Sequence, residues 1–423
     1  MSEMKTMFSV EFLYRKTPPD LTFPSMVIYE GLLNLIHASD TCDISTTAIA
    51  CISSREPFGD AFSRLRISQR PAIRISMVGT VTFHAEILNL LGANITIRRT
   101  YNNLAETIRG IRQNIPNVLY DQNNVVKIDP SIIIKGNREL SIIYDSQNIN
   151  FWREKPPAAP PLMKLHRYTG FTSLNAPYTT GQIKVQASPQ IILLFTIGLL
   201  SAFCGFNTES VGTAYYYFLF FSPQQLCEIF TNARQSANAK EFIDKYFRIK
   251  QHIVQELREI ISQSISSEHI ILEILFNVSI LSEILSSDID KIDFVMYNLE
   301  WRGREYILRQ IIPITVQKSI YAETLIRENF SDPYKFLTTI SEFVTNRTII
   351  NVLNSLHRRR PFVESSHILR AIRGLYSFLI GGNPSGWYTF IRELDCAYRI
   401  VDDERRKEEY KEWLRRFSYL RLR

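Results

Sequence analysis

The feature that most limits how this chain can fold is its longest apolar stretch, which runs from His166 to Phe221. The first part, residues 168–181, is a loop rich in Thr, Gly, Pro and Tyr, and a short strand pattern follows at residues 182–186. The last part, residues 211–221, is dominated by Tyr and Phe, and its periodicity leaves a buried strand and a core helix both open. Because a stretch of this kind must be shielded from water, we expect it to form a hydrophobic hinge between two halves of the protein.

A helix is predicted in the middle of this apolar stretch. Ser188-Pro189 is typical of an N-cap followed by proline at the first helical position, where a missing N–H costs nothing. We expect the helix to run from Pro189 to Cys204 and to end at Gly205, because glycine is favoured just after a helix. Ser222-Pro223 repeats the same signal and predicts the start of the next helix.

The same stretch raises the question of a membrane segment. Its most apolar part, Ile191 to Phe206, is 16 residues long, whereas a spanning helix needs about twenty mostly apolar residues. Lysine and arginine, which often anchor such segments, are missing between Lys184 and Arg234. We therefore favour a buried core helix, and we keep a membrane-associated protein inserted through Gln190–Phe221 as an alternative.

The pattern as a whole predicts an α+β protein. An N-terminal mixed α/β domain with antiparallel strands is expected over residues 1–155, and a mainly α-helical domain over residues 222–423. A proline-rich spacer and the apolar hinge, residues 156–221, would join them. Strands are expected at residues 7–15, 41–53, 182–186 and several times within 117–145, a strand pair at 292–312, and helices at 24–38, 223–233, 239–264, 268–285, 316–329, 333–356, 364–380 and 384–420, the last one broken.

Cysteine usage indicates a reducing compartment. The five cysteines are odd in number and include no CxxC spacing, so we expect neither a disulfide framework nor a zinc site. The pair Cys42 and Cys51 is assigned to packing. The N-terminus has no apolar segment of signal-peptide length, and a cytoplasmic location is therefore expected.

A row of arginines is the most informative polar feature. In residues 62–75 the even positions include Arg64, Arg66, Arg70 and Arg74, while the odd positions are mostly aliphatic. Since a strand alternates its faces with a period of two, one face would present four guanidinium groups, which suit phosphate oxygens. A solvated edge strand, in which charge prevents aggregation, explains the pattern equally well.

Further cations extend this candidate nucleic-acid-binding track. Residues 355–423 carry 15 basic and 9 acidic side chains, a net charge of +6, whereas residues 222–354 carry 14 and 17, a net charge of −3. We assign Arg98, Arg99, Arg358, Arg359 and Arg360 to phosphate contacts as well. Cations at the end of a helix also favour the helix dipole, which remains an alternative for the last three.

Sequence motifs for catalysis are missing, and we expect neither an enzyme nor a cofactor. The chain contains no GxxxxGK[ST], HExxH, GxSxG or paired CxxC motif. Cation binding at Asp288 and Asp290, or at Asp402, Asp403 and Glu404, stays open, and so does a metal-dependent nuclease as an alternative function. A glycine loop at residues 381–386 is more simply a turn between helices than a phosphate cradle.

Three runs of sequence resemble a known family. RYTGFTSLNAPYTT, the Ser-Pro helix with Ile197-Gly198-Leu199, and TAYYYFLFF together resemble the large subunit of the archaeal type I CRISPR Cascade complex, type I-A most of all. The segment VIYEGLLNLI, residues 27–36, is similar to the opening helix of that family. No functional motif of the family is matched, so the resemblance carries no site residue to this chain.

The resemblance implies a non-catalytic subunit of an RNA-guided complex in antiviral defence. Such a subunit contacts target DNA and the short motif beside the target, and it helps to recruit the nuclease-helicase. Base pairing with the guide RNA reads most of the target sequence in such systems. The expected partners are therefore target DNA, guide RNA, other Cascade subunits and the nuclease-helicase, and the loop at residues 168–181 is expected to approach bases.

Overall fold

A computed structural model describes residues 6–11, 19–45, 48–53, 61, 125–127, 132–135, 141–143, 184–187, 189–210, 213–261, 267–276, 287–301, 306–317, 330–356, 360–379 and 382–420. The contacts between residues divide the chain into two compact units. The first consists of Met1–Phe203, Phe220–Arg248 and Arg304–Leu308, and the second of Cys204–Leu219, Ile249–Gly303 and Arg309–Arg423. Neither unit is a continuous segment, and the linear boundaries expected at residues 156 and 222 stay a prediction.

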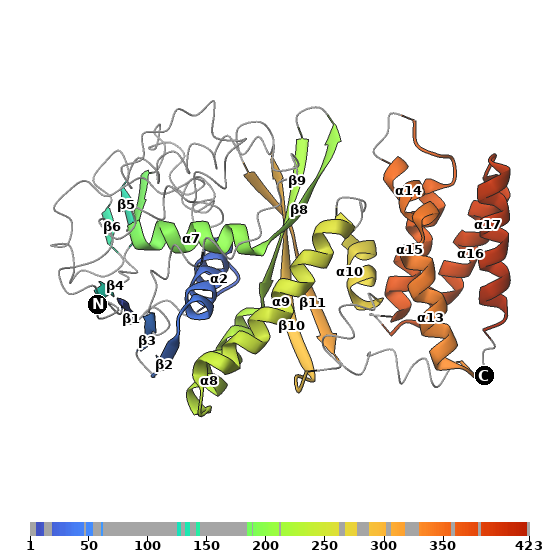
Figure 1. The fold of residues 1–423 in the computed structure, drawn as a ribbon. Helices are drawn as coiled ribbons and strands as arrows, with labels where there is room; N and C mark the ends of the chain where they lie inside the picture. The colour runs from blue at the N-terminus through green and yellow to red at the C-terminus, as the bar shows by residue number, and fades with distance from the viewer. Residues whose placement is uncertain are drawn as a thin grey trace, which may run out of the picture. The chain divides into compact units, whose positions relative to one another are not determined.

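The first unit contains two small sheets (Figure 1). Their strands are β1 (Thr6–Glu11), β2 (Thr41–Ile44), β3 (Ala48–Ser53), β4 (Val125–Lys127), β5 (Ile132–Lys135), β6 (Ser141–Ile143) and β7 (Lys184–Ala187). One sheet has the order β2-β3-β1-β4, in which β1 pairs antiparallel with β3 and parallel with β4. The other has the order β6-β5-β7 and is antiparallel throughout.

Two helices, α2 (Phe23–Ala38) and α7 (Pro189–Ala202), pack against each other in the first unit. Their backbones approach so closely that glycine is required on both sides. A Cβ atom added to Gly31 would lie 2.0 Å from the carbonyl oxygen of Leu194, and one added to Gly198 would lie 1.8 Å from that of Val27. Beside this contact the buried Glu30 accepts a 2.5 Å hydrogen bond from the Ser201 hydroxyl.

The end of α2 is tied to the start of α9 (Ala239–Ile261), which follows α8 (Pro223–Gln235). Nδ1 of His37, in the last turn of α2, lies 2.9 Å from Oδ1 of the buried Asp244, whose Oδ2 accepts a 2.5 Å hydrogen bond from Lys240. Burial opposes ionisation of this carboxyl, but the hydrogen bonds and charges of His37 and Lys240 outweigh it and lower the pKa of Asp244.

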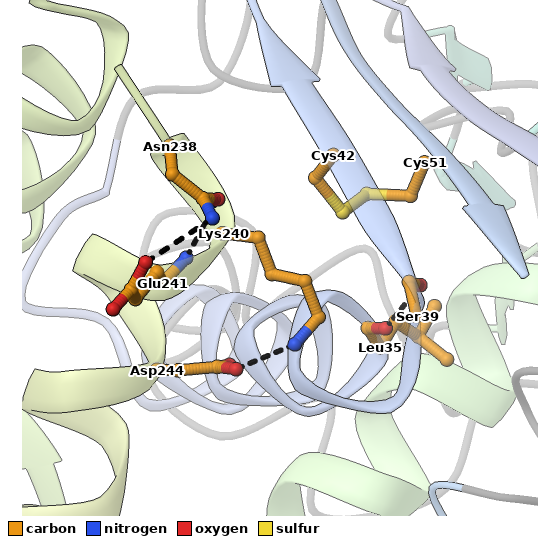
Figure 2. Close-up of a disulfide and its surroundings, with 8 residues drawn as sticks. All are labelled: Leu35, Ser39, Cys42, Cys51, Asn238, Lys240, Glu241 and Asp244. Carbon is orange, nitrogen blue, oxygen red and sulfur yellow. Dashed lines mark hydrogen bonds and ion pairs between the residues drawn. A yellow bond between two sulfur atoms is a disulfide. The ribbon is translucent and has the colours of Figure 1, made fainter. Parts of the chain in front are cut away.

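The segment expected to be one strand at residues 41–53 is an antiparallel hairpin, β2 and β3. Its register places Cys42 directly opposite Cys51, and their sulfur atoms form a disulfide (Figure 2). Our assignment of this pair to packing was therefore wrong. The reason is geometric: a nine-residue separation within one strand would keep the side chains far apart, whereas the turn of a hairpin brings them together.

The second unit contains a four-stranded sheet with the order β11-β10-β9-β8. Its strands are β8 (Phe203–Ser210), β9 (Thr213–Phe221), β10 (Lys291–Trp301) and β11 (Tyr306–Gln317). The aromatic run left open between strand and helix is thus the strand β9, and the expected strand pair at residues 292–312 is confirmed. The α7 helix ends at Ala202 rather than Cys204, and β8 begins at the next residue. Gly205, at φ +151°, therefore lies within a strand and does not end the helix as expected.

The C-terminal part of the second unit is helical (Figure 1). It contains α10 (Ser267–Phe276), α13 (Pro333–Val344), α14 (Arg347–Ser355), α15 (Ser365–Leu379), α16 (Pro384–Ile400) and α17 (Glu404–Ser418). The single helix expected at residues 333–356 is wrong, because the Asn346 side chain accepts hydrogen bonds from two backbone amides and starts α14 anew. The expected break in residues 384–420 is confirmed by the Asp403 cap of α17.

Helix starts in both units follow one sequence rule. Ser222, Asp332 and Asn383 each precede a proline, and each side chain accepts a hydrogen bond from a backbone amide of the first turn. The distances from amide nitrogen to side-chain oxygen are 3.1, 2.9 and 3.1 Å. Proline fixes the helical φ angle at the first position, so the cap and the proline together define where these helices begin.

The core of the helical part is aromatic and depends on a second glycine contact. Trp387, Phe390 and Phe417 lie with ring centroids 4.9 to 5.8 Å apart. Helices α15 and α16 touch where a Cβ on Gly374 would be 2.8 Å from the Phe390 amide nitrogen, and a Cβ on Gly386 would be 2.5 Å from the Gly374 carbonyl oxygen. These two helices therefore pack backbone to backbone.

The observed architecture confirms an α+β protein with small sheets in the N-terminal half and helices toward the C-terminus. The helix α7 has 14 residues and is followed directly by strands. Among the described helices, none combines the length and apolar character that crossing a membrane requires.

We predict that Gly374→Ala destabilises the protein by about 1–3 kcal/mol. Alanine would favour the isolated helix by about 1 kcal/mol, but its methyl group would meet the backbone of α16. The measurement is the thermal unfolding midpoint. Ser366→Ala, at an exposed position of the same helix, is the control and should leave the midpoint nearly unchanged. A Gly374→Ala midpoint at or above that of the parent would contradict the backbone contact.

A second prediction concerns pH and the buried His269, whose Nε2 lies 2.9 Å from the Val344 carbonyl oxygen. Burial lowers the pKa of His269 to about 4, although the hydrogen bond to Val344 opposes this shift. Since the unfolded chain binds a proton near pH 6.5 and the folded one does not, stability should be full above pH 6.5 and fall toward pH 4. The loss from this group is about 3 kcal/mol at most.

The variant His269→Gln keeps a donor for the Val344 carbonyl and has no titrating ring. Chemical denaturation at pH 7.5 and pH 5 should therefore show a smaller pH-dependent loss for the variant than for the parent. Equal losses in the two proteins would mean that His269 is not buried in its neutral form.

Candidate nucleic-acid interface

Most of the arginines predicted to bind phosphate lie outside the described residues. This holds for Arg64, Arg66, Arg70, Arg74, Arg98, Arg99, Arg358 and Arg359, and for the loop at residues 168–181. Arg360 is described: it lies between α14 and α15, is exposed, and forms no ion pair with the described part of the chain. Its assignment to phosphate binding stays a prediction.

A cluster of polar and charged side chains that the sequence did not reveal lies between α15 and α16. We call it the Glu393 cluster, and it consists of His367, Arg370, Arg392 and Glu393. Nδ1 of His367 lies 2.8 Å from Oε2 of Glu393, and Nη1 of Arg370 lies 3.6 Å from the same oxygen. Nη2 of Arg392 donates a 2.9 Å hydrogen bond to Oε1. Both carboxylate oxygens are therefore occupied by cationic partners.

The helix pair explains how these four side chains meet. His367 and Arg370 are three residues apart and so lie on one face of α15. Glu393 belongs to α16, and the glycine contact through Gly374 and Gly386 holds the two helices close enough for it to reach both partners. Without this close approach, the carboxylate would be too far from α15 to pair with its side chains.

The Glu393 cluster has more positive than negative charge. Burial by itself would raise the pKa of Glu393, but hydrogen bonds from His367 and Arg392, together with the charges of His367 and Arg370, lower it below its ordinary value. The Glu393 side chain is 7% exposed, whereas the side chains of Arg370 and Arg392 are 57% and 69% exposed. One buried negative charge thus orients two guanidinium groups that keep hydrogen-bond donors directed to solvent.

The exposed face of α16 adds an aromatic side chain to these cations. Tyr388 and Arg392 are four residues apart, and Tyr388 is 66% exposed. A tyrosine ring at the surface can stack on a nucleobase, and nearby guanidinium groups can pair with the phosphates of the same strand. Further along, Arg399 is paired with Asp395 at 2.8 Å, so its charge is largely balanced.

The terminal helix α17 is different, because most of its cations lie beside carboxylates, either within the helix or, for Arg406 and Arg416, on Glu364 and Glu342. Lys407, Lys411 and Arg415 each face a glutamate three residues earlier, at 3.8, 3.1 and 2.8 Å. This is the solvated face with intrahelical pairs that mixed charges at helical spacing predict. Helix α17 carries six basic and four acidic side chains, so it contributes +2 to the net charge of residues 355–423.

Other candidate sites have structural roles where they are described. Asp403 caps α17 by accepting a hydrogen bond from the Arg406 amide at 2.8 Å. In the glycine loop Asn383 caps α16 and Gly382 has φ +62°, as in an ordinary turn between helices. No group of three or more His, Cys, Asp or Glu side chains that could hold a metal ion occurs among the described residues, which include Asp288 and Asp290.

Comparison with known proteins gives one relative and no activity. The chain is similar to an uncharacterized protein of Archaeoglobus fulgidus, with 29% identity over 386 residues that cover 90% of this chain and 91% of the relative. No family model and no solved structure matches the chain.

We predict that Glu393→Gln costs about 1–2 kcal/mol of stability at pH 7, because Arg370 and Arg392 would lose their shared negative charge. The stability that Glu393 contributes is present above its ordinary pKa and is lost as pH falls through its lowered pKa. The difference between parent and variant in chemical denaturation should therefore shrink at pH 3. The control is Glu412→Gln, which removes one carboxylate from an exposed ion pair on α17 and should change stability little at either pH. Equal losses of stability in Glu393→Gln and Glu412→Gln would contradict the role of the Glu393 cluster.

Proposed function

We propose that this chain is a non-catalytic, nucleic-acid-binding large subunit of an RNA-guided CRISPR surveillance (Cascade) complex in the cytoplasm. In this role it would contact target DNA and the motif beside the target, and it would help to recruit the nuclease-helicase. The observation that carries the proposal is the Glu393 cluster, in which a buried carboxylate holds two exposed guanidinium groups in place.

The charge balance of the cluster suits a polyanion. Arg370 and Arg392 share one carboxylate with His367, so a phosphate group would meet a surface whose positive charge is only partly compensated. Guanidinium groups suit this contact because their planar donors match phosphate oxygens. Fixing the side chains before binding also reduces the conformational entropy lost when the ligand arrives.

The segments that carry the family resemblance give independent support. VIYEGLLNLI lies in α2, Ile197-Gly198-Leu199 lies in α7, and TAYYYFLFF is β9. Gly31 and Gly198, which allow α2 and α7 to approach, belong to the first two of these segments. The segments that resemble the family thus include a packing contact at which substitution is limited.

The proposal is tested by measuring how DNA binding depends on salt. Each phosphate contact contributes about 0.9 to the slope of log K against log salt for duplex DNA, and about 0.7 for a single strand. The double variant Arg370→Gln/Arg392→Gln should weaken binding and reduce the slope by roughly 1.4 to 1.8. The matched control is Arg399→Gln/Arg415→Gln, which removes the same charge from exposed side chains that already have carboxylate partners.

An equal loss in both double variants, or no loss in either, would reject the Glu393 cluster as the interface. Recovery of the tagged chain from its host should also yield short guide RNA and further protein subunits. Recovery of the chain alone would reject the assignment to an RNA-guided complex. Cleavage of labelled DNA or RNA that depends on Mg²⁺ or Mn²⁺ would favour the nuclease alternative.

A further inference from the structure

The Cys42–Cys51 disulfide lies where three parts of the first unit meet. β2 is the edge strand of its sheet and follows α2 directly, with Ser39 capping the end of that helix. The hairpin contacts α8, and Figure 2 shows Asn238, just before α9, and Lys240, in the first turn of α9, in the surroundings of the disulfide. The state of this bond therefore bears on how the edge strand β2 is held.

The two cysteines differ in their exposure to solvent. Cys42 is half-buried on the edge strand, whereas Cys51 is fully buried in the inner strand β3. Thiol–disulfide exchange requires a thiolate to reach one of the two sulfur atoms, and its rate depends on that access. An external thiol would therefore attack at Cys42.

The backbone pairing of the hairpin does not depend on the disulfide alone. The β2–β3 ladder pairs all four residues of β2, and the Asp40 amide donates a 3.0 Å hydrogen bond to the Ile52 carbonyl. The end of α2 is held separately by the contact between His37 and Asp244. Opening the bond thus does not require the unit to unfold, and the backbone returns the sulfur atoms to each other for closure.

We propose that Cys42 and Cys51 form a reversible redox clasp on the edge strand β2. In reduction, a thiolate of a small dithiol attacks Sγ of Cys42, the bond between the two cysteines breaks, and Sγ of Cys51 leaves as a thiolate that takes a proton from water. The second thiol of the reductant, once deprotonated, attacks the mixed disulfide. This attack releases Cys42 as a thiolate that is then protonated, and the reductant becomes a disulfide. The reduced hairpin opens more readily, and β2 loosens from β3.

The test uses the full chain in buffers of dithiothreitol at increasing ratio of reduced to oxidised form. Alkylation and mass spectrometry should show Cys42 and Cys51 converting together and reversibly under native conditions. Amide hydrogen exchange of β2 should be faster by about tenfold or more in the reduced protein, while exchange in α15 and α16 stays unchanged. The double variant Cys42→Ser/Cys51→Ser should behave like the reduced protein in both redox conditions.

Directionality is tested with single variants. With oxidised glutathione, Cys42 in the Cys51→Ser variant should form a mixed disulfide about tenfold faster than Cys51 does in Cys42→Ser. The proposal is rejected if the disulfide never forms, or if it resists excess dithiothreitol until the protein unfolds. It is also rejected if the amides of β2 exchange equally fast in the oxidised and reduced proteins, or if the two single variants react with oxidised glutathione at equal rates. The exchange comparison of the parent protein stands even where a serine variant fails to fold.

Discussion

Close backbone contact between helices is the constraint on which both units depend. In each unit one helix pair meets at opposing glycines, where any side chain would collide with the backbone of the partner. Such a contact tolerates little change in the distance between the helices, since moving either helix outward by the width of a methyl group would open a void in a closely packed interior. The positions of neighbouring side chains are fixed as a result.

The Glu393 cluster shows what this constraint achieves. Burying a lone carboxylate is costly, and the cost is offset only when its oxygens are paired and hydrogen-bonded. Here the partners come from α15 and from α16 itself, so the charge compensation depends on the distance between the two helices. Helix packing and the electrostatics of the candidate interface are therefore parts of one arrangement.

Much of the fold could be predicted from local sequence signals, whereas contacts between residues far apart in the sequence could not. Proline after a capping residue marked helix starts correctly, because both effects act within one turn. The restart at Asn346 was missed, since an asparagine inside an apolar pattern also fits an exposed helix position. The turn between Cys42 and Cys51 contains serine and threonines but neither glycine nor proline, so nothing marked a hairpin. His367 and Glu393 are 26 residues apart, and only the packing of their helices reveals that they interact.

The division of the chain into two discontinuous units has a consequence for synthesis. The first unit includes Phe220–Arg248 and Arg304–Leu308, and the start of the second unit, Cys204–Leu219, is made before these residues. A ribosome delivers the chain from its N-terminus. The first unit is therefore incomplete until Arg304–Leu308 have emerged, and the strands β8 and β9 of the second must wait for β10, which begins only at Lys291. Nascent chains that stall between these points would expose apolar surface, so we expect assembly of this protein to depend on uninterrupted elongation or on chaperones.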